Sequence, residues 1–272
     1  MEREGKEDME DLTVSQHQRL ATDIVHRKEW RRSPPGATGD TNLPLWLRPY
    51  LVIATGQDSG LIETIPDSTS LDTLKKKCPK YSTLTDYFVR AYGDQKTKSF
   101  QDAQTNFIES LAGYSLVCYF LQIKDRHNGN ILIDRKGHLI HIDYGFLLST
   151  SPGSINFESA PFKLTDEILE LMGGRSSDRF VYFKTLILCG FLQVRKHYQE
   201  FLMMIELMIP HTTLRCLTKE GVVDNFRNRF RLDLTSDAQC EEFVDKMISD
   251  SIGNWTTKSY DSYQYYTNNI TF

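Results

Sequence analysis

Five polar residues near the middle of the chain have the types and spacing that phosphate chemistry needs. Asp125, Arg126 and His127 come shortly before Asn130, and Asp143 follows two short apolar runs, ILI and HLIHI, that DRKG separates. A carboxylate or an imidazole in such a loop can take the proton of a hydroxyl group. An amide oxygen and a second carboxylate are hard ligands that suit Mg²⁺. The set therefore indicates phosphoryl transfer, with proton removal and metal binding at the same site.

A short β-hairpin would bring the two metal ligands together. The runs ILI and HLIHI predict two strands joined by a turn at DRKG. If Ile133 pairs with His138, then Asn130 lies opposite His141, and Asp143 lies two residues further out. At about 3.4 Å per residue, both side chains leave the open end of the hairpin within several ångströms of each other. One cation could then bridge them.

Each part of this set also has a purely structural interpretation. Asp143 could merely end a strand, and DRH could be a solvated turn held by an Asp–Arg pair. A zinc site at His138 and His141 is disfavoured because residues three apart in a strand point to opposite faces. Asn130 is predicted to lie across from the end of the second strand, near Asp143. A strand-ending role for Asp143 alone does not explain why an amide lies beside it, so the pair favours the metal-binding interpretation.

Several helices and a strand pair must hold this hairpin in place. LWLRPYLVIAT and LIETI predict two strands around a tight turn at 56–60. Apolar residues from Phe100 to Tyr114 recur at three- and four-residue steps, which predicts a long and largely buried helix. Further helical patterns cover 165–172, 178–209 and 236–250. We expect an α+β fold that is mostly helical.

Composition excludes several classes of protein. The 272 residues carry 32 Lys and Arg against 36 Asp and Glu, a net charge of −4, which gives no basic surplus for nucleic acid. The longest nearly uncharged apolar run, 115–123, is too short to span a bilayer, so we expect no transmembrane segment. The acidic N-terminus is unlike a signal peptide. Five widely spaced cysteines without a C-x-x-C pair favour reduced thiols and a cytoplasmic location.

The order of the motifs resembles the kinase plan, in which an Asp lies five residues before a metal-binding Asn and a D-F-G aspartate follows a hairpin. Here D-R-H replaces H-R-D and D-Y-G replaces D-F-G, and KDRHNGNILID with HIDYGF resembles the phosphatidylinositol 3-/4-kinase family. The segment PLWLRPYLVIATGQDSGLIETI resembles the strand–turn–strand that leads into the ATP hinge of that family. The type III beta 4-kinases of the family are most similar to the segments SLVCYFLQIKDRHNGNILID, FKLTDEILELMGG and TTKSYDSYQYYTNNI. The resemblance covers roughly 45–270.

The resemblance implies a role for each residue of an ATP and Mg²⁺ site. It gives Asn130 and Asp143 to Mg²⁺, and it gives Asp125 and His127, with Arg126 between them, to the inositol hydroxyl. Which of Asp125 and His127 removes the proton stays open. It implies that backbone groups of Glu63 and Ile65, in the hinge, bind adenine. The walls of the adenine site would be Tyr50, Ile62, Leu132 and Ile142.

The resemblance also implies the substrate and the place of action. Residues 146–166 would be the activation loop, in which Lys163 is the only basic residue. This favours phosphatidylinositol without extra phosphates and transfer to its 4-hydroxyl. A cluster of Trp and Tyr at the C-terminus suits a bilayer interface, although it could equally pack on the protein. We expect a peripheral enzyme of internal membranes, with the Golgi implied by the family, and regulatory proteins as further partners.

The first 43 residues depart from the family. No glycine-rich phosphate loop in a strand context occurs in 1–43, and we expect a mobile or linker-like lead there. The kinase-like bilobal fold would then have a truncated N-lobe and hinge at 44–66 and a helical C-lobe at 67–272 with the catalytic hairpin. Two alternatives to a lipid kinase follow: a catalytically impaired kinase-like binding module and, less favoured, a related protein Ser/Thr kinase.

Overall fold

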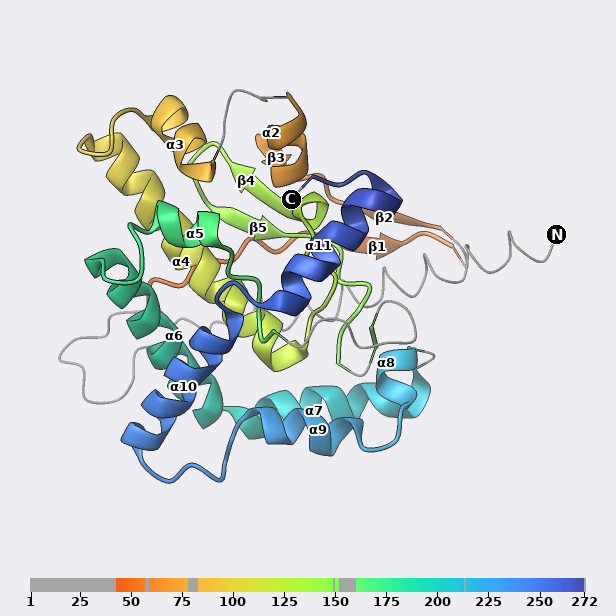
Figure 1. The fold of residues 1–272 in the computed structure, drawn as a ribbon. Coiled ribbons are helices and arrows are strands. Elements are labelled where there is room, and N and C mark those ends of the chain that lie inside the picture. The colour runs from red at the N-terminus through yellow and green to blue at the C-terminus, as the bar shows by residue number, and fades with distance from the viewer. Residues whose placement is uncertain are drawn as a thin grey trace.

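The computed structural model describes residues 43–56, 59–77, 83–148, 150–151, 160–212 and 214–271. It has an α+β fold in which helices predominate and two small antiparallel sheets lie on one side (Figure 1). This confirms the predicted fold class. The lead expected at 1–43 lies almost wholly outside the described residues, as does the middle of the expected activation loop.

A two-stranded ribbon forms the sheet nearest the N-terminal end of the described chain. Strands β1 (Val52–Ala54) and β2 (Gly60–Ile62) are antiparallel, and Val52 lies opposite Ile62. The strand–turn–strand prediction is confirmed. Val52 is buried, whereas Ile53 and Leu61 are more than half exposed.

The second sheet carries the hairpin and has the order β3-β4-β5. Its strands are β3 (Ser68–Ser70), β4 (Ile131–Asp134) and β5 (Leu139–His141). Sequence patterns did not predict β3, because Ser-Thr-Ser has no apolar alternation, and its pairing depends on β4, far away in the chain. The hairpin therefore supplies two of the three strands: β4 is the central strand of the sheet, and β5 is an edge strand.

The register of the hairpin differs by one residue from the prediction. Ile133 pairs with Leu139 and not with His138. The main-chain N–H of Asp134 donates to the His138 carbonyl at 3.1 Å, and Gly137 donates to the Asp134 carbonyl at 3.1 Å. Gly137 has φ +88°, a left-handed conformation that closes a three-residue loop. Asp134 thus ends the strand and does not begin the turn, which shifts every pair by one.

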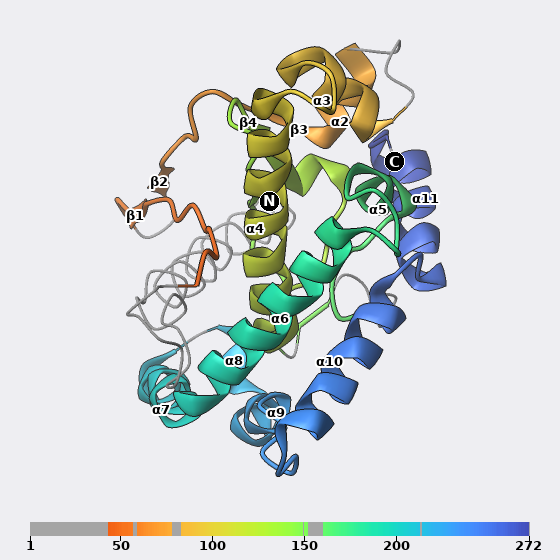
Figure 2. The same cartoon turned by 90° about the vertical axis from the view of Figure 1, so that its left-hand side faces the viewer.

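Helix α4 (Lys98–Leu121) is the long buried helix that the sequence predicts. Thr97 caps its N-terminus by accepting a hydrogen bond from the Phe100 N–H, and the helix ends at Gln122, with φ +50°. From Ser110 onward every residue of the helix is buried. Figure 2 shows α4 running through the length of the molecule, with α6 crossing it.

Helix α6 (Asp178–Lys196) approaches α4 closely because of one glycine. A Cβ on Gly190 would lie 2.3 Å from Leu116 Cδ1. Such a contact is closer than real Cβ atoms allow, so a larger residue at this position would require the Leu116 side chain or the helices to move. The helical pattern predicted at 178–209 is divided: α6 ends before His197, and α7 (Tyr198–Met208) continues beyond it.

The remaining helices complete the described fold. They are α2 (Leu71–Lys77), α3 (Leu84–Tyr92), η2 (Asn128–Asn130), α5 (Asp166–Leu171), η3 (Ile209–His211), α8 (Arg215–Thr218), α9 (Val222–Arg229), α10 (Asp237–Ser251) and α11 (Trp255–Asn268). The predicted helices at 165–172 and 236–250 correspond to α5 and α10. No helix in the described ranges is long and apolar enough to cross a membrane.

Helix α11 carries the C-terminal aromatic cluster and packs against the loop that contains Asp125. Tyr260 is 4% exposed, whereas Trp255 is 78% and Tyr266 is 84% exposed. One face of α11 therefore packs on the protein, and the other presents aromatic rings to solvent. The buried face agrees with packing on the protein, and contact of the exposed rings with a bilayer stays a prediction.

Candidate active site

The loop 122–127 after α4 is joined to the end of the hairpin by one arginine. Arg126 is 3% exposed, and its Nη1 donates to the Ile142 carbonyl at 2.7 Å. Its Nη2 donates to the Asp143 carbonyl, and its Nε donates to the Lys124 carbonyl at 3.1 Å. A planar guanidinium holds donors on three separate nitrogens in a fixed fork and so reaches three carbonyls that lie apart, whereas a lysine has all its donors on one nitrogen. Arg126 thus contacts main-chain atoms and fixes the loop against the strand end.

Asn130 and Asp143 lie together at the open end of the hairpin. The Ile142 N–H donates to the Asn130 carbonyl at 3.1 Å, so Asn130 faces Ile142 and not His141 as the predicted register had it. The shift places Asp143 one residue beyond the partner of Asn130, closer than expected. Asp143 has φ +57°, and its Oδ1 accepts a hydrogen bond from the Gly145 N–H at 3.1 Å.

The oxygens of these two side chains fit a magnesium ion. Asn130 Nδ2 donates to the Asp125 carbonyl at 3.0 Å, which leaves the amide oxygen as the free end of the side chain. Arg126 binds the carbonyl of Asp143 and not its carboxylate, so the carboxylate is not neutralised by that cation. An amide oxygen and a carboxylate are the hard donors that Mg²⁺ takes together with phosphate oxygens and water.

Asp125 and His127 form a close pair within the same loop. His127 Nε2 lies 3.6 Å from Asp125 Oδ1, and the Gly129 N–H donates to His127 Nδ1 at 3.1 Å. Nδ1 therefore accepts, and the neutral ring carries its hydrogen on Nε2, toward Asp125. Burial raises the pKa of Asp125, although a hydrogen bond from Tyr260 opposes this. Burial lowers the pKa of His127, against the attraction of Asp125.

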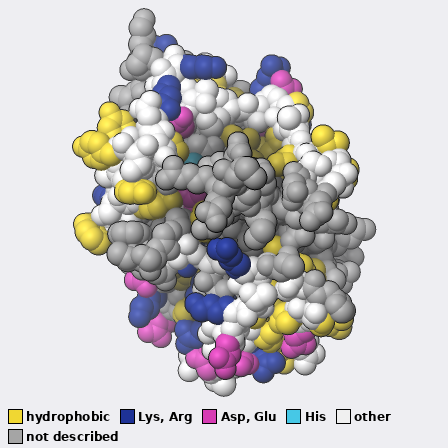
Figure 3. Space-filling model, turned by 90° about the vertical axis from the view of Figure 1, so that its right-hand side faces the viewer, with side chains coloured by type: hydrophobic (Ala, Val, Ile, Leu, Met, Phe, Trp, Pro, Cys, Tyr) yellow, Lys and Arg dark blue, Asp and Glu magenta, His cyan; other side chains and the backbone are white. Residues whose placement is uncertain are grey.

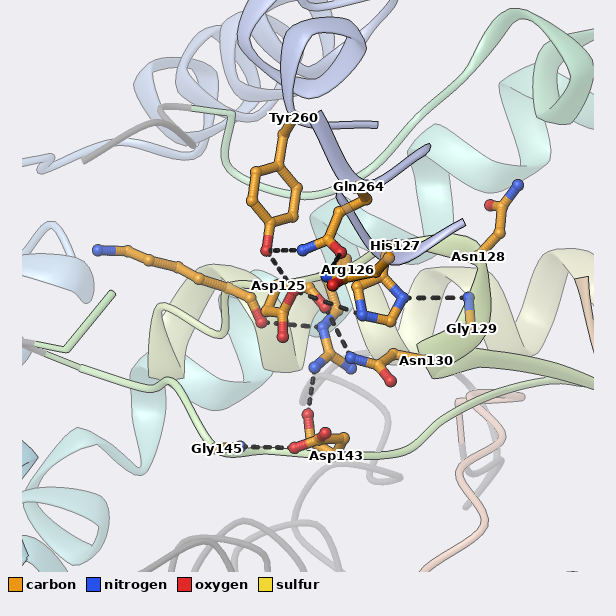
Figure 4. A network of polar contacts seen from close by, with 12 residues as sticks. Asp125, Arg126, His127, Asn128, Gly129, Asn130, Asp143, Gly145, Tyr260 and Gln264 are labelled. Atoms are coloured by element: carbon orange, nitrogen blue, oxygen red, sulfur yellow. Dashed lines mark hydrogen bonds and ion pairs between the residues drawn. The ribbon is translucent and has the colours of Figure 1, made fainter. Parts of the chain in front are cut away.

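Two residues of α11 complete the site, and sequence patterns did not indicate their role. The Tyr260 hydroxyl donates to Asp125 Oδ1, and Gln264 Nε2 donates to the Tyr260 hydroxyl at 2.6 Å. Figure 4 shows Tyr260 and Gln264 above Asp125, with Asp143 on the opposite side of Arg126. The tyrosine-rich C-terminus was the only signal, and it gave no way to select Tyr260.

Lys163 lies near the site but is not presented to solvent. The side chain is 5% exposed, and its Nζ lies 2.6 Å from Asp261 Oδ1 on α11 and 3.4 Å from Asn128 Oδ1. This buried pair connects the segment before α5 with α11 and with the loop of Asp125. The assignment of Lys163 to a substrate loop stays a prediction.

The residues predicted to wall the adenine site differ in burial. Tyr50 is 3% exposed, and its ring stacks on Tyr144 at 6.4 Å between centroids. Burial raises the pKa of Tyr50 to about 12, while Arg126 opposes the rise. Leu132 and Ile142 are partly buried against the core, whereas Ile62 is 56% exposed.

The predicted hinge residues are already engaged within the chain. The Glu63 N–H donates to the Leu51 carbonyl at 2.8 Å, and the Glu63 carboxylate accepts hydrogen bonds from Arg48 and from the Leu51 N–H. The Ile65 carbonyl accepts a hydrogen bond from the Ser68 hydroxyl at 2.8 Å. A carbonyl has two lone pairs, so Ile65 keeps one acceptor site. Their contact with adenine stays a prediction.

A mostly helical lobe that presents a D-R-H loop, an asparagine and a D-Y-G aspartate at one hairpin end has the arrangement of a kinase catalytic lobe. A family model, "Phosphatidylinositol 3- and 4-kinase", matches residues 39–216. This chain belongs to that family.

Individual relatives agree with the family match. The chain is 49% identical over 232 residues to "Phosphatidylinositol 4-kinase" of Dictyostelium discoideum, covering 85% of this chain and 20% of the relative. It is 50% identical over 237 residues to "Phosphatidylinositol 4-kinase beta 1" of Arabidopsis thaliana, covering 85% and 21%. With "Phosphatidylinositol 4-kinase beta" of Xenopus tropicalis the identity is 43% over 228 residues, covering 84% and 28%. The chain thus spans between a fifth and somewhat over a quarter of these relatives.

Proposed function

We propose that this chain is the catalytic part of a lipid kinase that transfers the γ-phosphoryl group of ATP to the 4-hydroxyl of phosphatidylinositol. One observation carries the proposal: Asn130 and Asp143 lie at one open hairpin end, and Arg126 joins that end to the loop of Asp125. The names of the relatives, all phosphatidylinositol 4-kinases, support the lipid and the position of the hydroxyl.

Asp125 is the proton acceptor in this proposal, and His127 positions it. The lone pair of His127 Nδ1 accepts from the Gly129 N–H, and Nε2 carries the hydrogen that faces Asp125. Neutral His127 therefore has no lone pair left for a substrate hydroxyl. The carboxylate of Asp125 has several acceptor sites, and the hydrogen bond from Tyr260 occupies one of them.

Asn130 and Asp143 would hold Mg²⁺ through the amide oxygen and the carboxylate. When bound, the ion would neutralise charge on the ATP phosphates. Tyr50, Leu132 and Ile142 would contribute apolar surface to the adenine site, with Ile62 at its edge. Tyr50 and Tyr144 already stack beside Asp143, which supports a preformed floor.

The substrate would be reached at a membrane surface. Exposed aromatic side chains of α11, Trp255 and Tyr266 foremost, would contact the interface, where Trp and Tyr are favoured. A cytoplasmic enzyme held peripherally on internal membranes, such as the Golgi, fits this proposal, and regulatory proteins would act on it there. The alternatives of an impaired module and of a protein kinase have no support among these relatives.

Transfer from labelled ATP to phosphatidylinositol vesicles tests the proposal. The chain should label phosphatidylinositol in the presence of Mg²⁺, and Asp143→Ala should abolish labelling, whereas the distant surface variant Lys96→Ala should not change it. A protein mixture in place of vesicles should remain unlabelled. Labelling that survives in Asp143→Ala, or that appears only on protein, would refute this function.

A further inference from the structure

The segment that follows α11 returns to the candidate active site. Helix α11 is capped at its C-terminus by Asn269, which has φ +54°, a left-handed conformation that asparagine tolerates at a helix end. The chain turns there, and the Ile270 N–H donates to the Gln264 carbonyl at 3.3 Å. Thr271 then reaches both α2 and η2, and the last described residues lie beside α2 in Figures 1 and 2.

Thr271 forms hydrogen bonds in two directions. Its carbonyl accepts a hydrogen bond at 3.0 Å from Asn128 Nδ2, in the loop between Asp125 and Asn130. Its N–H and its hydroxyl both donate to Asp72 Oδ1 on α2, at 2.7 and 2.8 Å. Thr271 thus links a carboxylate of α2 to an amide of the loop that contains Asp125.

Asn128 anchors this loop and does not face the reacting groups. The residue is 6% exposed, and Figure 4 shows its side chain pointing away from Asp125 and Asp143. Its Nδ2 is bound to the Thr271 carbonyl, and its Oδ1 lies 3.4 Å from Lys163 Nζ. Because both ends of the amide are held within the chain, the position of Asn128 determines where the loop on either side of it lies.

Asp72 is well suited to hold Thr271. Its side chain is 14% exposed, and its second oxygen, Oδ2, accepts a hydrogen bond from Lys76 Nζ at 2.9 Å. Burial raises the pKa of Asp72, but hydrogen bonds from Lys76 and Thr271 outweigh this and hold the pKa below its ordinary value. The group is therefore a carboxylate at neutral pH, and hydrogen bonds to a charged acceptor are stronger than those between neutral groups.

An ion pair between Asp and Lys does not by itself indicate such a role. Lys or Arg side chains lie beside Asp or Glu side chains at several places on the face of the molecule in Figure 3. Lys98 and Asp102 on α4 form a pair at the same four-residue spacing, with side chains 88% and 61% exposed. Asp72 differs because its carboxylate is mostly buried and binds a segment from the far end of the sequence.

We propose that Asp72 is a positioning residue: it holds Thr271, Thr271 holds Asn128, and the loop that contains Asp125 thereby keeps its place relative to α2. Helix α2 follows the predicted hinge closely in the sequence. A carboxylate outside every catalytic motif thus fixes the proton acceptor relative to the hinge side of the site. Its effect on transfer rests on the proposed function, whereas the attachment of the loop does not.

Amide hydrogen exchange, followed by NMR on the whole chain, tests the attachment without any reaction. The probes are the N–H groups of Gly129 and Asn130, which both donate to His127. Asp72→Ala should speed their exchange about tenfold, because the loop loses an anchor, while amides in the middle of α4 keep their wild-type rates. Asp72→Asn retains an oxygen that can accept from Thr271, and it should restore most of the protection.

The matched control is Asp102→Ala, which breaks an exposed ion pair of the same spacing and should change neither set of exchange rates. Steady-state kinetics on phosphatidylinositol vesicles give a second measurement. Asp72→Ala should lower kcat about tenfold at an unchanged KM for ATP, because the acceptor is displaced while nucleotide binding is not. Asp72→Asn should recover most of this loss.

Unchanged exchange of the loop amides in Asp72→Ala overturns the proposal. Equal acceleration in the loop and in α4 also overturns it, because that result indicates a general loss of stability. Faster exchange of the loop with an unaltered kcat overturns the role in catalysis. Absence of transfer by the wild type refutes the proposed function instead, and the exchange rates still decide whether Asp72 holds the loop.

Discussion

Arg126 is bonded to Asp143 through the main-chain carbonyl and not through the carboxylate. The loop that contains Asp125 is thereby attached to Asp143, the second of the two residues proposed to bind the metal ion. The arrangement couples the two halves of the candidate site in position, while it leaves the charge of Asp143 available for a cation.

Arg126→Lys should reduce the transfer rate about a hundredfold, because the single nitrogen of a lysine cannot reach all three carbonyls that the guanidinium fork spans, and the loop would shift by about an ångström. Steady-state kinetics on vesicles measures the change. The matched control is Arg135→Lys, at an exposed ion pair with Asp67, which should leave the rate unaltered. A wild-type rate in Arg126→Lys would contradict the positioning role.

Tyr260→Phe should lower kcat about tenfold, because Asp125 loses the hydroxyl that holds its carboxylate in place. The free energy of unfolding should fall by about 1–3 kcal/mol, because the hydroxyl makes two hydrogen bonds, one of them to a carboxylate. Tyr263→Phe, at an exposed ring of the same helix, is the control. Equal kcat values for the two variants would show that α11 does not position Asp125.

The buried pair of Lys163 and Asp261 should show strong coupling in a double-mutant cycle. Lys163→Met or Asp261→Leu alone should each cost about 3–5 kcal/mol in unfolding free energy, because each leaves one buried charge without its partner. The double variant should lose far less than the sum of the two. Additive losses, measured by urea unfolding, would mean that the pair does not act as a unit.

The hairpin turn should make stability depend on pH in the acid range. Burial of Asp134 raises the pKa of its carboxyl, but hydrogen bonds from the side chain and main chain of His138 outweigh this and hold the pKa below its ordinary value. The carboxylate therefore stabilises the fold above about pH 3.9, and this contribution is lost as the pH falls through the lowered folded-state pKa.

Asp134→Asn isolates this effect. Wild type should be the more stable protein at about pH 6, and the difference in unfolding free energy should shrink steadily below about pH 4. Urea unfolding at several pH values gives both curves. A constant difference down to about pH 2 would mean that Asp134 is not responsible.

The sequence was sufficient for elements defined by local patterns. The 3.6-residue periodicity located α4, and the two apolar runs located the hairpin that carries Asn130 and Asp143. The register was not predictable at the same level, because it depends on whether Gly137 closes a three-residue loop or belongs to a four-residue turn. Both loops are compatible with the same amino-acid sequence, and the strand pairings that they produce differ by one residue.

Contacts between distant segments lie beyond such patterns. Tyr260 reaches Asp125 across 135 positions, and Lys163 reaches Asp261 across 98. One tyrosine among several in α11 is selected only by the rotation of that helix against the loop of Asp125, which no local periodicity fixes. Strand β3 is hidden for a related reason, since three small polar residues become a strand only when β4 lies alongside.

Helix α4 touches the hairpin at one end and continues into the catalytic loop at the other. At the tip, a Cβ on Gly137 would lie 2.8 Å from the Ala103 carbonyl oxygen, and Asp125 follows soon after the last turn at Leu121. The helix thus fixes the distance and the orientation between the hairpin turn and the loop that contains Asp125. Adding a single residue near its middle would rotate one end by about 100° relative to the other, so its length is as much a determinant of activity as any side chain.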